Sequence, residues 1–181
     1  VPMDNMAALE AAVNENTCAI MLEPIQGESG VNPVSLEYIR SVRSLCYEKD
    51  IILIFDEVQC GMGRTGDLFA CQHDEITPDI VCIAKGLGAG IQPIGAMLCQ
   101  GFIYDAIVGG SGFFQHGHTY IGHPTACAAG LAVLDVLTET PLLNQVKQQG
   151  DLLQTRLREA LGSHPWLGDV RGRGLFIGVE L

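Results

Sequence analysis

The sequence has little positive charge and no long apolar segment. Lys and Arg number 10 among 181 residues, against 21 Asp and Glu, which gives a formal net charge of −11. Proteins that bind nucleic acid or anionic membranes in a general way present a basic face, so this balance argues against both functions. No apolar run reaches the length of a membrane span, and no basic segment followed by an apolar one opens the chain.

The cysteines lack the spacing of a disulfide framework or a zinc site. An odd number of them is scattered along the chain, with no Cys-x-x-Cys pair: Cys18, Cys46, Cys60, Cys71, Cys82, Cys99 and Cys127. This pattern favours reduced thiols, and hence a cytoplasmic location.

Glycine and apolar residues are abundant. The chain contains 22 glycines, bunched in its middle, and is 48% apolar but only 17% charged, which is enough for a sizeable core. By length we expect one domain or slightly more. The sequence opens at Val1 without Met and stops at Leu181 within an apolar alternation, so we expect a piece of a longer chain.

Apolar runs alternate with amphipathic patterns along the sequence. We expect strands at residues 18–22, 51–55, 80–84 and 95–99, helices at 4–15, 36–46, 125–137 and 141–161, a helical turn at 68–72, and a strand or hairpin at 168–181. Asp4 and Ser35 are the expected N-caps of the first two helices. Strands that are apolar throughout are typical of a mostly parallel α/β sheet covered on both faces.

Three of the apolar runs stop at an ionisable residue and pass directly into a glycine-containing loop. These residues are Glu23, Asp56 and Lys85. In open α/β sheets the ligand crevice lies beyond the carboxyl ends of the strands, so parallel strands would bring two acids and one amine together there.

Each strand-end residue also has a purely structural interpretation. A carboxylate at a strand end often caps the next turn, which leaves the role of Glu23 open. Lys85 is harder to explain in this way, because the other two lysines, Lys49 and Lys147, lie in solvated helical patterns. We expect Lys85 to be partly buried, which lowers the pKa of an amine and makes it a usable nucleophile or base.

Two nucleotide-binding motifs are weak here. Residues 51–57 resemble the acidic strand end that holds magnesium in P-loop ATPases, but no lysine is followed by Ser or Thr, and that function leaves Lys85 unexplained. Residues 61–66 match Gly-x-Gly-x-x-Gly, yet they do not stand directly at a strand-to-helix turn as a dinucleotide fingerprint does.

Four segments, in this order, resemble the class III pyridoxal-phosphate-dependent aminotransferases. They are Leu-Glu-Pro-Ile-Gln-Gly-Glu-Ser-Gly at 22–30, Ile-Phe-Asp-Glu-Val-Gln-Cys-Gly-Met-Gly-Arg-Thr-Gly at 54–66, Pro-Asp-Ile-Val-Cys-Ile-Ala-Lys-Gly-Leu-Gly at 78–88, and His-Gly-His-Thr-Tyr-Ile-Gly-His-Pro at 116–124. The last segment looks more like the ω-amino-acid and amine branch than the ornithine branch. The resemblance spans about residues 1–181 and implies a fold-type-I α/β transferase, with part of the cofactor-binding large domain at 1–138 and the start of a small α+β C-terminal domain at 139–181.

The resemblance implies a role for each matching residue around pyridoxal 5′-phosphate. Lys85 would form the Schiff base with the cofactor and then move the substrate proton. Asp56 would keep the pyridine nitrogen protonated, Gln59 would bond the ring 3-oxygen, and Val58 would pack on the ring face. Thr119 would bond the cofactor phosphate of the partner subunit, which implies a homodimer with shared active sites.

The implied reaction is transfer of an amino group from an amino acid or amine to a 2-oxo acid. Glu28 matches a position near the substrate, and Glu23 matches an acid beside the cofactor. The family also contains aminomutases and decarboxylases, and a truncated piece that is inactive on its own is a further alternative. The family's upstream phosphate loop and its downstream substrate-binding arginine are not among these residues, so the substrate is not encoded in the motifs present.

Two further polar features have a structural interpretation. His116, His118 and His123 have a spacing that metal ligands can show, but the family's loop holds no metal, and histidines in a glycine-bearing loop can serve local hydrogen bonds. We therefore predict no metal. We expect Arg64 to fix its glycine-rich loop against carboxylates.

Overall fold

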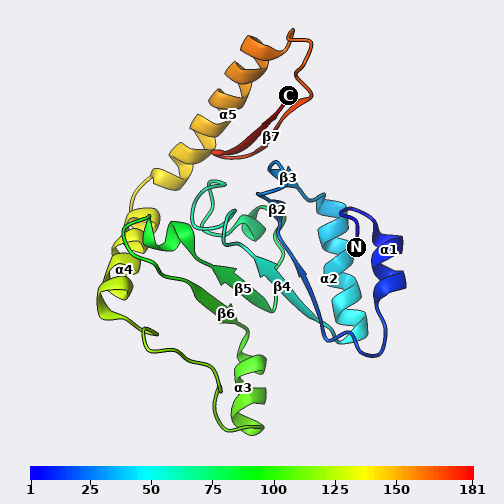
Figure 1. Ribbon diagram of the computed structural model, residues 1–181, viewed down its shortest axis with the longest axis vertical. Helices are drawn as coiled ribbons and strands as arrows, with labels where there is room; N and C mark the ends of the chain where they lie inside the picture. The colour runs from blue at the N-terminus through cyan, green and yellow to red at the C-terminus, as the bar shows by residue number, and fades with distance from the viewer.

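The computed structural model describes residues Val1–Leu181, which fold around one four-stranded sheet (Figure 1). The strands are β1 (Ala19–Leu22), β4 (Ile52–Asp56), β5 (Ile80–Ile83) and β6 (Ala96–Cys99), and their order in the sheet is β1-β4-β5-β6. Strands β1, β4 and β5 pair in parallel, whereas β6 runs antiparallel to β5. The predicted, mostly parallel α/β sheet is confirmed.

Five α-helices surround this sheet. They are α1 (Met6–Ala12), α2 (Leu36–Lys49), α3 (Gly101–Gly109), α4 (Pro124–Glu139) and α5 (Leu142–Leu161), with short 3₁₀ helices η1 (Ala70–Asp74) and η2 (Lys85–Gly88). Two antiparallel hairpins complete the fold, β2 (Ile25–Gln26) with β3 (Asn32–Pro33), and β7 (Asp169–Arg173) with β8 (Phe176–Glu180). In Figure 1, α1 and α2 lie beside the β1 edge, α4 lies on the opposite side, and α5 stands apart with β7.

Helix α2 has the boundaries and the buried face that its sequence pattern predicts. The Ser35 hydroxyl accepts a hydrogen bond from the Tyr38 amide at 3.2 Å, so Ser35 is the N-cap. Asp50, with a left-handed φ of 53°, ends the helix. The apolar side chains at helical spacing pack on Leu53 and Phe55 of β4, and together they form the largest apolar cluster of the molecule.

Helix α1 is shorter than predicted, and Asp4 is not its cap. Asn5 is the N-cap, because its side chain accepts a hydrogen bond from the Ala8 amide at 2.9 Å. The Asp4 carboxylate instead accepts hydrogen bonds from the amide and hydroxyl of Ser35, at 3.1 and 2.9 Å. Asp4 therefore joins the start of the chain to the start of α2, a long-range contact that the local pattern does not reveal.

The predicted covering of the sheet on both faces is wrong for β6. Every residue of this edge strand is exposed, and the following helix α3, to which the sequence pattern assigned no element, buries none of its residues. Large apolar side chains remain exposed across residues 102–121, namely Phe102, Tyr104, Val108, Phe113, Phe114, Tyr120 and Ile121. Of these, Tyr120 and Ile121 line a pocket with residues 92–96 and the start of α4, yet both stay exposed.

The C-terminal residues form the predicted helix and hairpin but contact little of the sheet. Leu152 and Leu153 of α5 are apolar, yet they are 45% and 42% exposed. No single helix is long and apolar enough to cross a membrane, and α4 with α5 meets the length and composition criteria only as a pair bent by 71°.

A buried ion pair fixes α2 to the beginning of β5. The Arg43 guanidinium lies 2.9 Å from Asp79 Oδ2, and both residues are buried. The same carboxylate oxygen accepts a hydrogen bond from the Leu53 amide at 2.7 Å, so one carboxylate joins α2, β4 and β5. Removing one partner of such a pair leaves an uncompensated buried charge.

We therefore expect Asp79→Ala to lower the free energy of unfolding by about 3–5 kcal/mol, because Arg43 stays buried without its counter-charge. Urea unfolding of the full-length protein measures this loss. Asp151→Ala is the matched control, since Asp151 is exposed and its carboxylate makes no hydrogen bond; its effect should stay within about 0.5 kcal/mol. Equal effects of the two substitutions would contradict the role given to Asp79.

Candidate functional site

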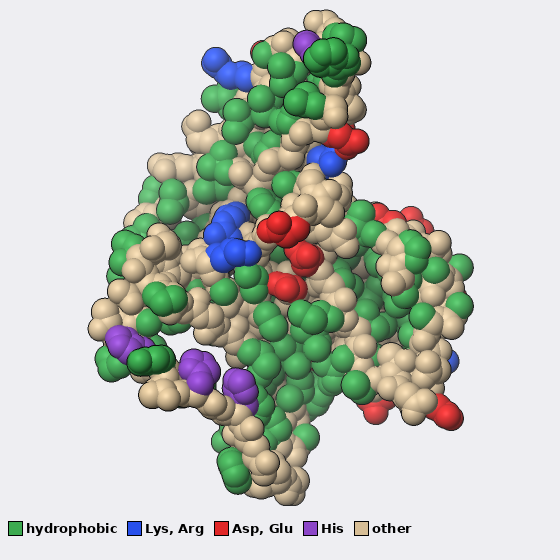
Figure 2. Space-filling model, in the orientation of Figure 1, with side chains coloured by type: hydrophobic (Ala, Val, Ile, Leu, Met, Phe, Trp, Pro, Cys, Tyr) green, Lys and Arg blue, Asp and Glu red, His purple; other side chains and the backbone are tan.

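The carboxyl ends of β1, β4 and β5 place three ionisable residues at one edge of the sheet. Leu22 is in register with Phe55, and Asp56 with Cys82. Glu23 therefore leaves β1 at the level of Asp56, and Lys85 follows three residues after Cys82. Figure 2 shows acidic side chains next to basic ones near the middle of the molecule, above an apolar surface. An amine and two carboxylates thus share the edge where open α/β sheets bind ligands.

The chain turns sharply after Asp56, and polar contacts fix this turn. Asp56 Oδ1 accepts a hydrogen bond from the Val58 amide at 3.0 Å, while Asp56 Oδ2 has no hydrogen-bond partner. One nitrogen of Arg64 donates to the carbonyl oxygens of Val58 and Gln59, at 3.2 and 2.7 Å. The prediction that Arg64 binds carboxylates is therefore wrong. Its guanidinium donates to the backbone carbonyls of the turn instead.

The loop after β1 closes over the same turn. Glu23 Oε2 accepts a hydrogen bond from the Gly27 amide at 3.2 Å, and Gln59 Nε2 donates to Glu28 Oε1 at 2.6 Å. A Cβ atom on Gly27 would lie 1.9 Å from Gln59 Oε1, so only glycine lets the amide take this place. Glu23, Glu28 and Gln59 are thereby joined into one polar group beside Asp56.

Lys85 is exposed rather than partly buried as expected, because no element of this chain covers its end of β5. Its amine makes no hydrogen bond and no ion pair, whereas Lys147 pairs with Asp67 at 2.7 Å. Lys85 has a left-handed φ of 44°, a conformation that costs a non-glycine residue about 1–3 kcal/mol and is concentrated at functional sites. A Cβ atom on Gly86 would lie 2.8 Å from Met62 Cβ, so the loops after β4 and β5 touch directly behind the lysine.

Glu57 is a buried acid that the sequence pattern did not single out. Its side chain is fully buried, and its two oxygens accept hydrogen bonds from the Ala70 and Cys71 amides at 2.6 and 2.8 Å. Burial raises the pKa of the Glu57 carboxyl, and the two backbone hydrogen bonds oppose that shift. Only its place beside Asp56 signalled a role, which is to fasten η1 to the end of β4.

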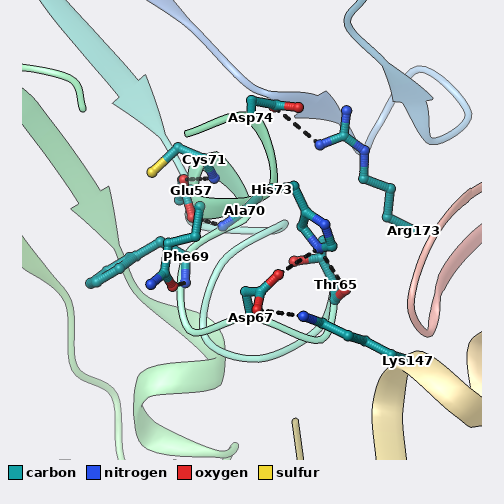
Figure 3. A network of polar contacts seen from close by, with 11 residues as sticks. Glu57, Thr65, Asp67, Phe69, Ala70, Cys71, His73, Asp74, Lys147 and Arg173 are labelled. Atoms are coloured by element: carbon teal, nitrogen blue, oxygen red, sulfur yellow. Dashed lines mark hydrogen bonds and ion pairs between the residues drawn. The ribbon is translucent and has the colours of Figure 1, made fainter. Parts of the chain in front are cut away.

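A network of charged residues connects the loop after this turn to the C-terminal segment (Figure 3). His73 Nε2 lies 3.0 Å from Asp67 Oδ2, and Lys147 of α5 reaches the other oxygen of Asp67 at 2.7 Å. Arg173 of β7 pairs with Asp74 of η1 at 3.1 Å. The C-terminal segment is therefore fastened to the loop that follows the site.

Thr119 and its neighbouring histidines lie elsewhere. They are exposed in the segment between α3 and α4, and no hydrogen bond links Thr119 to Asp56 or Lys85. The structure contains no group of three or more His, Cys, Asp or Glu side chains placed to hold a metal ion.

The buried Glu57 predicts a pH dependence of stability. Because its pKa is raised in the folded state, the folded protein holds the Glu57 proton more tightly than the unfolded chain does. The contribution of Glu57 to the free energy of unfolding should therefore decrease as the pH rises from about 4.5, the unperturbed value, through the raised pKa. Urea unfolding of wild type and Glu57→Gln across this range isolates the effect, because the glutamine does not titrate. A wild-type advantage that grows with pH would contradict this assignment.

The fold and this edge together define an α/β protein with a candidate ligand site at the carboxyl ends of its parallel strands. Residues 2–181 match the family model described as Aminotransferase class-III. The chain belongs to the class III aminotransferase family.

Ornithine and acetylornithine aminotransferases are among its relatives by sequence. Over 181 residues the chain is 43% identical to ornithine aminotransferase 2 of Staphylococcus aureus strain N315. It is 48% identical over the same length to acetylornithine aminotransferase of Neisseria meningitidis serogroup B. In both comparisons all of this chain is covered, and it spans 44% of the length of the relative.

Solved structures give the same family. Ornithine aminotransferase from Toxoplasma gondii superimposes with a TM-score of 0.91 at 39% identity, over 100% of this chain and 42% of that one, and its structure is described with partial occupancy of PLP at the active site. An (S)-enantioselective omega-transaminase from Thermomicrobium roseum gives 0.90 at 36% identity, over 97% and 39%. Both kinds of enzyme are among the relatives, so the ω-amino-acid and amine branch stays a prediction.

Proposed function

We propose that the protein transfers an amino group from an amino acid or amine to a 2-oxo acid with the help of pyridoxal 5′-phosphate. The observation that carries this proposal is the common edge of the sheet that Asp56 and Lys85 share, with the Gln59 amide beside them. Membership in the class III family supports it.

The residues at this edge fit the cofactor. Pyridoxal phosphate supplies an aldehyde that combines with amines and a ring that withdraws electrons from the reacting carbon. Asp56 Oδ2, which has no partner within the chain, would accept a hydrogen bond from the protonated ring nitrogen. Gln59 would bond the ring oxygen and Val58 would pack on the ring face. The absence of a side chain at Gly27 is what leaves room for Gln59 there.

Lys85 would hold the cofactor and carry the proton. Its amine has no competing partner, so its lone pair is available once the amine is deprotonated. During transfer the Lys85 nitrogen would accept the proton from the substrate carbon and deliver it to C4′ of the cofactor. Glu28 and Glu23 would face the substrate side of this arrangement, joined through Gly27 and Gln59.

Borohydride reduction of the full-length protein in the presence of pyridoxal phosphate, followed by peptide mapping, tests the proposal. We expect a pyridoxyl group on Lys85, because its amine is the one at the carboxyl edge of the sheet. Lys49 and Lys147 serve as internal controls in the same digest. A label on either control, or no label at all, would contradict the assignment.

We infer that the active protein is a homodimer in which Thr119 serves the partner's cofactor phosphate. Thr119 has no hydrogen bond to Asp56 or Lys85 of its own chain, and the segment around it exposes a large apolar surface. Apolar patches of this kind mark interaction surfaces. A loop hydroxyl beside backbone amides is a suitable phosphate contact.

Mixed dimers test which subunit supplies Thr119. Thr119→Ala should weaken cofactor retention about tenfold, the loss expected for one hydrogen bond to a charged group. A dimer of one Thr119→Ala subunit and one Lys85→Ala subunit should contain one intact site and retain cofactor as tightly as wild type. If that mixed dimer binds no better than the Thr119→Ala homodimer, the threonine serves its own subunit.

We also infer a cytoplasmic location and a domain boundary near residue 138. All seven cysteines are free thiols, as expected in a reducing compartment. Residues 139–181 would begin a C-terminal domain, since α5 and the β7–β8 hairpin meet the rest of the chain mainly through the loops after β1 and β4.

A further inference from the structure

The loop between β2 and β3 is a tight, strained turn that carries Glu28. The amides of Gly30 and Val31 both donate to the Gly27 carbonyl at 3.2 Å. Gly30 has a φ of 110° and Val31 a left-handed φ of 55°, which is unfavourable for a β-branched residue. Such a turn keeps its shape only where other parts of the molecule hold it.

Arg171 of β7 holds this loop from outside. Its Nε donates a hydrogen bond to the Gly30 carbonyl at 3.1 Å, across 141 positions of sequence. Asp169 and Glu180, on β7 and β8, both accept from its Nη1 and orient the guanidinium. The Arg171 side chain is 21% exposed, and a Cβ atom on Gly30 would lie 3.0 Å from one of its terminal nitrogens.

The strand beside Arg171 is shaped to receive the same loop. Gly178 pairs with Arg171 in the hairpin, and a Cβ atom there would lie 2.6 Å from the Gly30 carbonyl oxygen. The Phe176 ring lies 3.1 Å from where a Cβ of Gly27 would be. The loop therefore approaches β8 at both Gly27 and Gly30, and Arg171 bonds the Gly30 carbonyl.

We propose that Arg171 is a positioning residue for the amino-donor side of the site: it fixes the loop at residues 27–31 so that Glu28 meets Gln59. This inference rests on the proposed aminotransferase function. The C-terminal hairpin would thereby take part in substrate binding, because its residue Arg171 determines the position of Glu28, which faces the substrate.

The contacts predict which kinetic constant Arg171 controls. Arg64 holds the backbone of Val58 and Gln59 independently of Arg171, so the turn next to the cofactor stays in place when Arg171 is lost. Charged side chains hold the loop with Glu28 at two points, Glu23 at the Gly27 amide and Arg171 at the Gly30 carbonyl, and only Arg171 holds it on the C-terminal side of Glu28. Loss of Arg171 should therefore affect donor binding and leave cofactor retention intact.

Steady-state kinetics of the full-length enzyme, with an amino donor and a 2-oxo acid acceptor, test this. Arg171→Ala should raise KM for the donor about tenfold, as expected for a lost hydrogen bond from a charged donor, with bound cofactor and its absorbance unchanged. In a Glu28→Gln background the same substitution should change KM less than about twofold, since residues that act through one another are not additive. The control is Arg156→Ala, an exposed arginine of α5 without hydrogen bonds, which should behave as wild type.

Three results would overturn the proposal: an unchanged donor KM, loss of cofactor, or a full tenfold effect that persists in the Glu28→Gln background. If Arg171→Ala fails to fold, Gly178→Ala decides by the same criteria, because its methyl group displaces the Gly30 carbonyl without removing a charge.

A wild-type enzyme that transfers no amino group would overturn the proposed function, and this inference with it. Transfer by wild type with an unchanged KM in the variant would overturn the inference alone.

Discussion

Because β1, β4 and β5 pair in parallel, the loops that follow these three strands all begin at the same edge of the sheet. The site depends on that pairing. Residues that are 62 positions apart, from Glu23 to Lys85, reach one place only when these strands share a direction and a register. An antiparallel arrangement would send Asp56 and Lys85 to opposite edges. The functional argument therefore depends first on backbone pairing and only then on side-chain chemistry.

Around this edge, three charged side chains hold the backbone of the loops that surround the site. Arg64 bonds two carbonyls of the turn after β4, and Glu57 bonds two amides of η1. Arg171 bonds the carbonyl of Gly30. Contacts of this kind fix the path of a loop and leave Oδ2 of Asp56 and the amine of Lys85 without partners, which suits a site that must receive a cofactor and a substrate.

Local sequence signals predicted the elements of the fold well, because they depend on neighbouring residues alone. The apolar runs became strands and Ser35 became the cap of α2. The wrong cap at Asp4 and the overlooked Glu57 have the same cause, because both residues bind partners that are distant in sequence. Ser35 lies 31 positions from Asp4, and the Ala70 and Cys71 amides lie 13 and 14 positions from Glu57.

The candidate site was predictable in its residues but not in its surroundings. Strand ends and motifs pointed to Lys85 and Asp56, yet the exposure of Lys85 depends on what covers the edge, which is a matter of tertiary and quaternary packing. The same is true of β6, whose apolar sequence suggested burial that the 181 residues do not provide. The support from Arg171 could not be foreseen either, because it joins the β2–β3 loop to a hairpin 141 positions away in the sequence.

A crystal structure of the full-length protein with pyridoxal phosphate bound tests the central claim most directly. The account predicts continuous electron density between Lys85 Nζ and the cofactor, with a carboxylate oxygen of Asp56 within hydrogen-bond distance of the ring nitrogen. A cofactor bound away from the carboxyl edge of β4 and β5, or with its ring nitrogen facing a group other than Asp56, would contradict it.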